Sequence, residues 1–251
     1  MKRSTLASLF TLAGASVLMG SGSALAASNS FVVDLNKAFD DGYSGVTATM
    51  DFLFGDGGDS NPSTYTLDLK ISNTSSSPIT KSSLVGFAFD TPTGVSSLIY
   101  DRNGTNFFQT PDTTISPAPS FNFCASTDNK NNPDKVNCQS GSVKQGLANG
   151  EFATVKYKFN FVGSNPTTDS VTTAFFNLFS GLQISPPPNN DLAVKDSVVL
   201  AARFQGIYSA TINDGSDKIT GKPAVKPPPG PPDAVPGPMP LLGAAAAFAQ
   251  S

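Results

Sequence analysis

Few residues of this chain are of the types that usually carry out catalysis. Histidine is absent, and Glu151 is the one glutamate among the 19 acidic residues. Without histidine, Ser-His-Asp and Cys-His nucleophilic centres and most zinc sites are excluded. Glu151 follows Asn149 and Gly150, where a lone carboxylate is typical of a solvated turn. We therefore expect no catalytic residue, no cofactor and no enzymatic activity.

Carboxylate and amide oxygens gather in two loops. Asp56, Asp59 and Asn61 occupy the first, and Asp214 and Asp217 occupy the second. Oxygen ligands suit calcium, although neither loop has the spacing of an EF-hand or of a calcium-binding nonapeptide repeat. Ordinary turn chemistry is the interpretation that the spacing favours, with a calcium site in the first loop as the alternative. A pair of aspartates could also hydrolyse a glycosidic bond, but no two are singled out.

The two cysteines, Cys124 and Cys138, enclose a polar segment rich in turn residues. In an oxidising compartment this spacing predicts a disulfide that closes a surface loop. A metal site is the alternative, but two sulfurs without histidine do not complete a common zinc set.

The elements that must position these residues are mainly strands, because apolar and polar residues alternate along the chain. The clearest runs are 65–71 and 155–161, which predict strands with one wet face. Runs 84–89 and 197–204 are evenly apolar, which predicts burial on both faces. Further strands are expected over residues 31–35, 46–54, 95–100, 121–124 and 207–212.

About nine short strands separated by Gly, Pro and Asn turns predict an all-β fold, an antiparallel β-sandwich of the jelly-roll or immunoglobulin-like type with few short helices. The best helix candidate is 169–182, with Asp169 or Ser170 as N-cap and Gly181 near its end, although a strand fits this segment too. The 19 phenylalanines and five tyrosines, with no tryptophan, indicate core filling. Residues 103–108, which end in Phe107 and Phe108, predict either a cap on the sandwich or an exposed recognition loop.

The N-terminus resembles an export signal. Lys2 and Arg3 precede an apolar stretch, and small residues surround Ala26 and Ala27. This order predicts a signal peptide over residues 1–26, cleaved between Ala26 and Ala27, and an exported domain over residues 27–221. Without the signal the chain has 14 basic and 19 acidic residues, a net charge near −5. Scattered lysines on an acidic chain exclude a nucleic-acid partner.

A proline-rich linker is expected over residues 222–234, followed by a short apolar segment over 235–251. The second segment begins with Val235, Pro236, Gly237 and Pro238, followed by Met-Pro-Leu-Leu-Gly and an alanine run. This pattern resembles the sorting signal of the PEP-CTERM family, in the cyanobacterial variant in which Pro-Gly-Pro replaces Pro-Glu-Pro. The apolar run from Met239 to Ala249 is about half of the ~20 residues that a spanning helix requires, and no basic cluster follows it. We therefore expect an incomplete, truncated or inactive signal.

The resemblance implies an exported, non-enzymatic protein of the cell surface or extracellular matrix with a structural or adhesive role. It also implies an exosortase-type enzyme as a partner where the signal works, and a transient association with the membrane where the signal is complete. A secreted carbohydrate-binding module that contacts extracellular polysaccharide is the alternative, favoured by a polar surface of low charge. An aspartate-based glycoside hydrolase is the third possibility.

Overall fold

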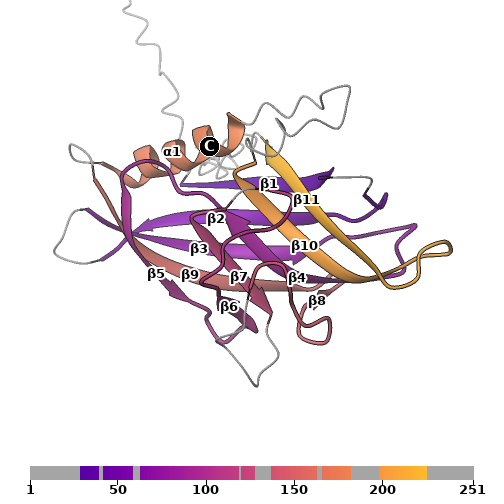
Figure 1. The fold of residues 1–251 in the computed structure, drawn as a ribbon. Coiled ribbons are helices and arrows are strands. Elements are labelled where there is room, and N and C mark those ends of the chain that lie inside the picture. The colour runs from indigo at the N-terminus through magenta and orange to yellow at the C-terminus, as the bar shows by residue number, and fades with distance from the viewer. Residues whose placement is uncertain are drawn as a thin grey trace, which may run out of the picture.

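The computed structural model describes residues 29–39, 42–58, 63–118, 120–127, 137–162, 166–181 and 198–224. These residues form an all-β fold with one helix (Figure 1). The elements are β1 (Ser30–Ala38), β2 (Ala48–Asp56), β3 (Thr64–Asn73), β4 (Lys81–Phe89), β5 (Val95–Asp101), β6 (Phe107–Gln109), β7 (Phe123–Thr127), β8 (Leu147–Ala148), β9 (Phe152–Phe161), α1 (Thr168–Ser180), β10 (Leu200–Tyr208) and β11 (Gly215–Ala224). The predicted all-β class is confirmed.

All strand pairs belong to one antiparallel sheet. Its order is β5-β9-β3-β2-β1-β11-β10-β4-β7-β6, and β8 pairs with β4. The sheet folds over, so that β5-β9-β3-β2 forms one wall and β10-β4-β7-β6 forms the other, as in a sandwich. The sheet almost closes where the two ends meet, because the Tyr100 hydroxyl on β5 donates a hydrogen bond to the Phe107 carbonyl on β6 at 3.0 Å.

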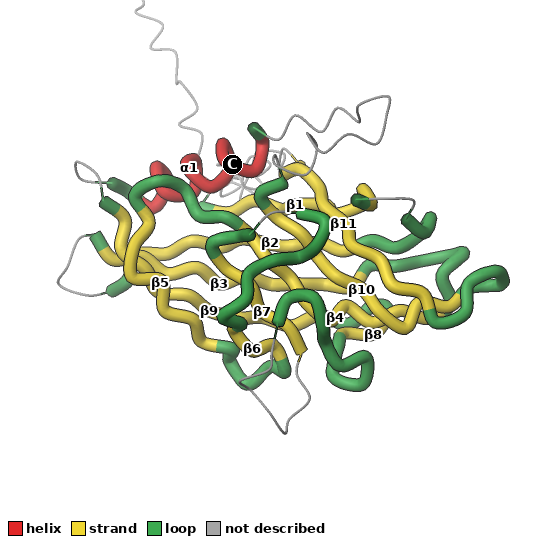
Figure 2. Tube along the Cα trace, viewed as in Figure 1, coloured by secondary structure: helices red, strands yellow, loops and turns green. Residues whose placement is uncertain are grey.

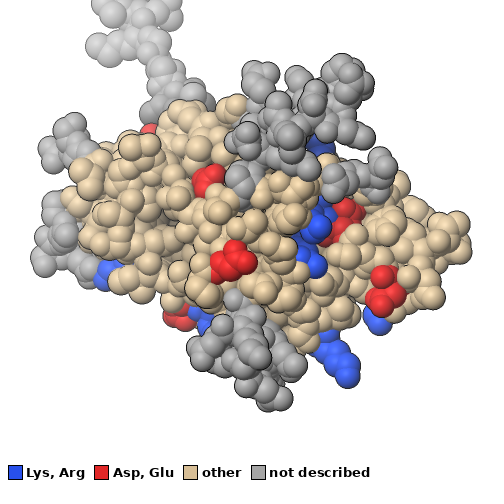
Figure 3. All heavy atoms as spheres, viewed as in Figure 1, with Lys and Arg blue, Asp and Glu red and all other residues tan. Residues whose placement is uncertain are grey.

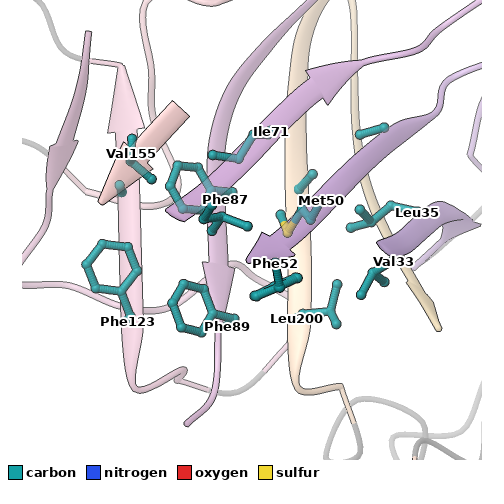
Figure 4. Packing of buried hydrophobic residues seen from close by; sticks show 14 of the residues in the cluster. Val33, Leu35, Met50, Phe52, Ile71, Phe87, Phe89, Phe123, Val155 and Leu200 are labelled. Atoms are coloured by element: carbon teal, nitrogen blue, oxygen red, sulfur yellow. The ribbon is translucent and has the colours of Figure 1, made fainter. Parts of the chain in front are cut away.

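Aromatic rings fill the space between the walls, as the composition predicts. Figure 4 shows Phe52 and Phe89 pointing into the shared interior from opposite walls, and their ring centroids lie 6.1 Å apart. Phe89 also contacts Phe123 at 5.2 Å, and Phe123 contacts Tyr157 at 5.0 Å. These residues belong to one continuous core cluster that draws on both walls and on the helix. Burial of this apolar surface is the main stabilising contribution to the fold.

Helix α1 packs beside β1, β2 and β11 (Figure 1). It buries Val171, Phe175 and Phe179 on one face, and Phe179 contacts Phe52 at 5.1 Å. The predicted helix is therefore confirmed, but the predicted caps at Asp169 and Ser170 are wrong. Thr167 is the N-cap: its hydroxyl accepts from the Ser170 amide, and the Ser170 hydroxyl accepts from the Thr167 amide. This reciprocal capping box satisfies the backbone N–H groups of Thr167 and Ser170. An N-cap at Asp169 or Ser170 would not form this pair of hydrogen bonds.

Loops cover part of the outer face of the second wall and explain why β4, and β10 at Ala201, bury apolar residues on that face. A second cluster packs Ile115 and Phe121 of the loop before β7 against Ala88 of β4 and Ala201 of β10. Figure 2 shows this loop region crossing in front of the sheet. The segment after Cys138 also lies close, since a Cβ on Gly141 would lie 2.7 Å from the Val85 Cβ. The predicted burial of 84–89 on both faces is confirmed.

Two strand predictions differ from the structure at the β10–β11 hairpin. The separate strand expected over 207–212 is wrong: β10 continues to Tyr208, and the Ser209 amide then donates to the Ile212 carbonyl within the turn. Strand β11 was not predicted. It extends to Ala224, so the proline-rich linker does not begin at residue 222.

The two end strands of the sheet are irregular or short. Strand β5 pairs only with β9, and its register shifts between Ser96 and Ile99, where Ser97 has a φ of 53°. Strand β6 pairs only with β7 over three residues. Neither end therefore presents a long, straight row of free backbone groups.

Candidate functional site

The structure describes part of the two loops considered for calcium. Asp56 is exposed at the end of β2, and Asp59 and Asn61 lie outside the described residues. In the second loop, Asp214 lies in the turn, whereas the Asp217 carboxylate on β11 accepts the backbone N–H of Tyr43 at 2.9 Å. In the part of the chain that the structure describes, no three His, Cys, Asp or Glu side chains come together as a metal site.

Glu151 lies in a tight turn, as the sequence predicts. Its Oε2 accepts the Ala148 amide at 2.8 Å, and Gly150 has a φ of 82°. The carboxylate therefore closes the turn between β8 and β9. In the segment 103–108, Phe107 is buried in the core, and the Arg102 guanidinium lies 4.7 Å from the centre of the Phe108 ring. In this segment, Phe107 therefore fills part of the core, and Phe108 forms a cation–π pair with Arg102.

The predicted disulfide between Cys124 and Cys138 is confirmed, with the two Cα atoms 6.2 Å apart. Both cysteines are fully buried, in the outer cluster that covers β4 and β10. The bond therefore ties β7 to the segment that follows Cys138, in which Gly141 packs against Val85 of β4. Residues 128–136 of the enclosed loop lie outside the described part of the chain.

The predicted targeting residues lie outside the described part of the chain. They are Ala26 and Ala27 at the expected cleavage point and Val235, Pro236, Gly237 and Pro238 of the sorting motif. The described residues include no helix that combines the length and the apolar character needed to cross a lipid bilayer.

The outer face of the first wall is polar, with isolated apolar side chains. Lys156 of β9 and Asp68 of β3 form an ion pair at 3.9 Å, and both are well exposed. Lys70 of β3 lies over the ring of Phe152 at 4.5 Å. Among the residues that the structure describes, the most exposed large apolar ones are Leu53 (48%), Ile99 (62%), Phe152 (62%) and Val162 (73%). On this face, the exposed ring of Phe152 therefore lies beside the Lys70 amine.

The outer face of the second wall carries a pair of cations that sequence reasoning missed. Arg203 of β10 pairs in register with Lys218 of β11, so both side chains leave the same face of the sheet. On its other side Arg203 pairs with Gly86 of β4. Both cationic side chains are partly exposed. Figure 3 shows how sparse charged groups are on the face it draws, in keeping with 14% charged residues overall.

Gln205 holds the Arg203 side chain in place. With its amide oriented to suit its neighbours, its oxygen accepts from an Arg203 terminal nitrogen at 3.0 Å and its nitrogen donates to the Gly141 carbonyl at 2.9 Å. The Arg203 Nε and the Gln145 Oε1 are buried without a hydrogen-bond partner. Burial lowers the pKa of the Arg203 guanidinium from its ordinary value.

Two tyrosines in the core differ in how their hydroxyls are satisfied. The Tyr157 hydroxyl is buried without a partner among the rings of Phe89, Phe123 and Tyr100, and burial raises the pKa of Tyr157 well above its ordinary value. Tyr100 donates to the Phe107 carbonyl. The two residues therefore form a matched pair for substitution.

Tyr157→Phe is expected to raise the free energy of unfolding by about 1 kcal/mol, because it removes a buried hydroxyl that has lost its water and gained no acceptor. Tyr100→Phe removes the same atom but breaks a hydrogen bond, so it should lower that free energy by about 1 kcal/mol. Urea denaturation of both variants measures the difference. Equal destabilisation by the two substitutions would contradict the assignment of the unpaired hydroxyl.

No known family model matches this chain, and no curated protein matches it.

Proposed function

We propose that this chain is an exported, non-enzymatic protein of the cell surface or extracellular matrix, with a structural or adhesive role. Its C-terminal segment, residues 235–251, carries an incomplete PEP-CTERM-type sorting signal, and an exosortase-type enzyme is its partner where that signal works. The described domain is the part displayed outside the cell, and the segment after Ala224 connects it to the sorting signal.

The observation that carries the proposal is the buried disulfide between Cys124 and Cys138. Disulfides form and persist in oxidising compartments and are rare in the cytosol. This agrees with the expected signal peptide over residues 1–26. The sparse surface charge and the aromatic interior further support a stable structural module.

Export can be tested by expressing two forms in a bacterium with an intact secretion pathway: the full chain and a chain without residues 2–26. The full chain is expected outside the cytosol, oxidised, with its N-terminus at Ala27 as measured by mass spectrometry. The shortened form is expected in the cytosol with free thiols. Recovery of the full, unprocessed chain from the cytosol would contradict the proposal.

Replacement of Pro236 and Pro238 by alanine, in a host with an exosortase, tests the sorting signal by its effect on surface retention.

A secreted carbohydrate-binding module is the second candidate, and the outer face of the first wall favours it. Phe152 is 62% exposed and lies beneath the Lys70 amine, which provides a stacking surface next to polar groups. Loss of binding to neutral polysaccharide on Phe152→Ala, without loss of stability, would favour this candidate.

A further inference from the structure

We propose that Arg203 and Lys218 form a binding site for oxyanion groups, carboxylate or sulfate, carried by an acidic polysaccharide. The inference deepens the proposed adhesive role by naming a ligand class, and it rests on that role for the ligand being an extracellular polymer. The site lies on the outer face of the second wall, away from Phe152 and Lys70.

The two cations lie side by side without a carboxylate paired to either of them among the described residues. Arg203 and Lys218 lie directly opposite each other on β10 and β11. Like charges at opposed positions of antiparallel strands destabilise the sheet. The single ion pair between described residues joins Lys156 to Asp68 on the other wall, so neither the Arg203 guanidinium nor the Lys218 amine forms an ion pair with a described carboxylate. An oxyanion bound between the two cations would remove this repulsion.

The Arg203 guanidinium is held in place before any ligand binds. Gln205 accepts from one terminal nitrogen of Arg203 and is itself anchored to the Gly141 carbonyl. A guanidinium fixed in this way loses little conformational freedom when it forms paired hydrogen bonds to a planar carboxylate or to sulfate. Its partial burial strengthens such bonds, since the surrounding dielectric is lower than that of water.

A ligand can reach both cations from solvent. Arg203 is flanked on β4 by Gly86, which has no side chain, and both cations keep part of their surface exposed. Two cations on adjacent strands are also close enough to contact one anionic group together. A polymer with repeated anionic groups gains further affinity through multivalency, which offsets the modest strength of a single small site.

The experiment measures retention of the full chain, purified under non-reducing conditions, on immobilised polygalacturonate, dextran sulfate and neutral dextran. Binding to at least one anionic polymer, none to dextran, and weakening by salt are expected. Arg203→Gln should weaken binding by at least about tenfold, and Lys218→Gln by about three- to tenfold. Lys158→Gln, which removes the same charge from an exposed position of β9 on the opposite wall, is the matched control and should change binding by less than about twofold.

Absence of anionic-polymer binding by the parent chain, or equal losses in Lys158→Gln and Lys218→Gln, would overturn the inference. Lys218→Gln keeps the inference testable if Arg203→Gln lowers the melting temperature, because the Lys218 side chain is partly exposed. Competition with free sulfate distinguishes a site for small anions from a polymer site. If free sulfate fully displaced the chain from the polymer at a concentration equal to that of the polymer's anionic groups, the polymer assignment would be overturned. If the chain is exported but does not bind an anionic polymer, this inference alone is contradicted. If the chain binds an anionic polymer but stays in the cytosol, the proposed function alone is contradicted.

Discussion

Phe89→Ala is expected to lower the free energy of unfolding by about 3–5 kcal/mol. Phe89 is fully buried, and its ring contacts Phe52 at 6.1 Å, Phe123 at 5.2 Å and Tyr157 at 5.5 Å. The substitution removes apolar contacts with both walls and leaves a cavity that the surrounding rings cannot fully close. A loss of this size is a large fraction of the stability of an ordinary domain, so the variant should be close to unfolding at 37 °C.

Urea denaturation at 25 °C, followed by far-ultraviolet circular dichroism, measures this loss. Phe152→Ala is the matched control, because it removes the same side chain from a site that is 62% exposed, and it should change stability by less than about 0.5 kcal/mol. Phe89→Leu retains most of the volume and should cost less than Phe89→Ala. If the alanine variants at 89 and 152 lost equal stability, the packing of the two walls through Phe89 would be contradicted.

Cys124→Ser is expected to lower the free energy of unfolding by about 3 kcal/mol and to leave localisation unchanged. The bond joins residues 14 positions apart, and in the chain-entropy model closure of such a loop restricts the unfolded chain by about that amount. Because both cysteines are fully buried under the loops on the second wall, the substitution also exposes this outer layer to local opening.

Thermal unfolding with and without reductant measures the contribution of the disulfide. The oxidised parent chain should melt at a higher temperature than the reduced parent chain, and the Cys124→Ser variant should be insensitive to reductant. A double variant with alanine at 124 and 138 separates loss of the bond from burial of a serine hydroxyl. Identical melting of the parent chain under both conditions would count against the bond.

Much of the first wall was predictable because its strands have one wet face. In β3 and β9 every second side chain points inward, so the alternation over 65–71 and 155–161 follows directly from the structure. The evenly apolar run in β4 was also informative, since loops cover the face that would otherwise be exposed. The Cys pairing followed from spacing and turn composition, as both cysteines flank one polar loop.

Strand β11 was missed because its sequence, GSDKITGKPA, contains little apolar alternation. It is held by its neighbours β1 and β10 on both sides, through backbone hydrogen bonds that the sequence pattern does not reveal. At Gly221 the chain approaches β1 so closely that a Cβ would collide with the Asp34 backbone. Here tertiary packing, rather than local propensity, decides the structure.

The cation pair could not be predicted for a related reason. Arg203 and Lys218 are 15 positions apart in the sequence, and only the register of the β10–β11 hairpin places them opposite each other. That register shifts between Gln205 and Ile207, at Gly206 with a φ of 59°. An irregularity of this kind changes which residues share a face, and sequence alternation carries no signal for it.

The irregular ends of the sheet determine how copies of this chain behave when they are crowded. The positive φ at Ser97 interrupts β5, and β6 at the other end has three residues, so neither strand offers a long regular edge with which a strand of another molecule could pair. We therefore expect neither of these two strands to extend the sheet from one copy of the chain to the next.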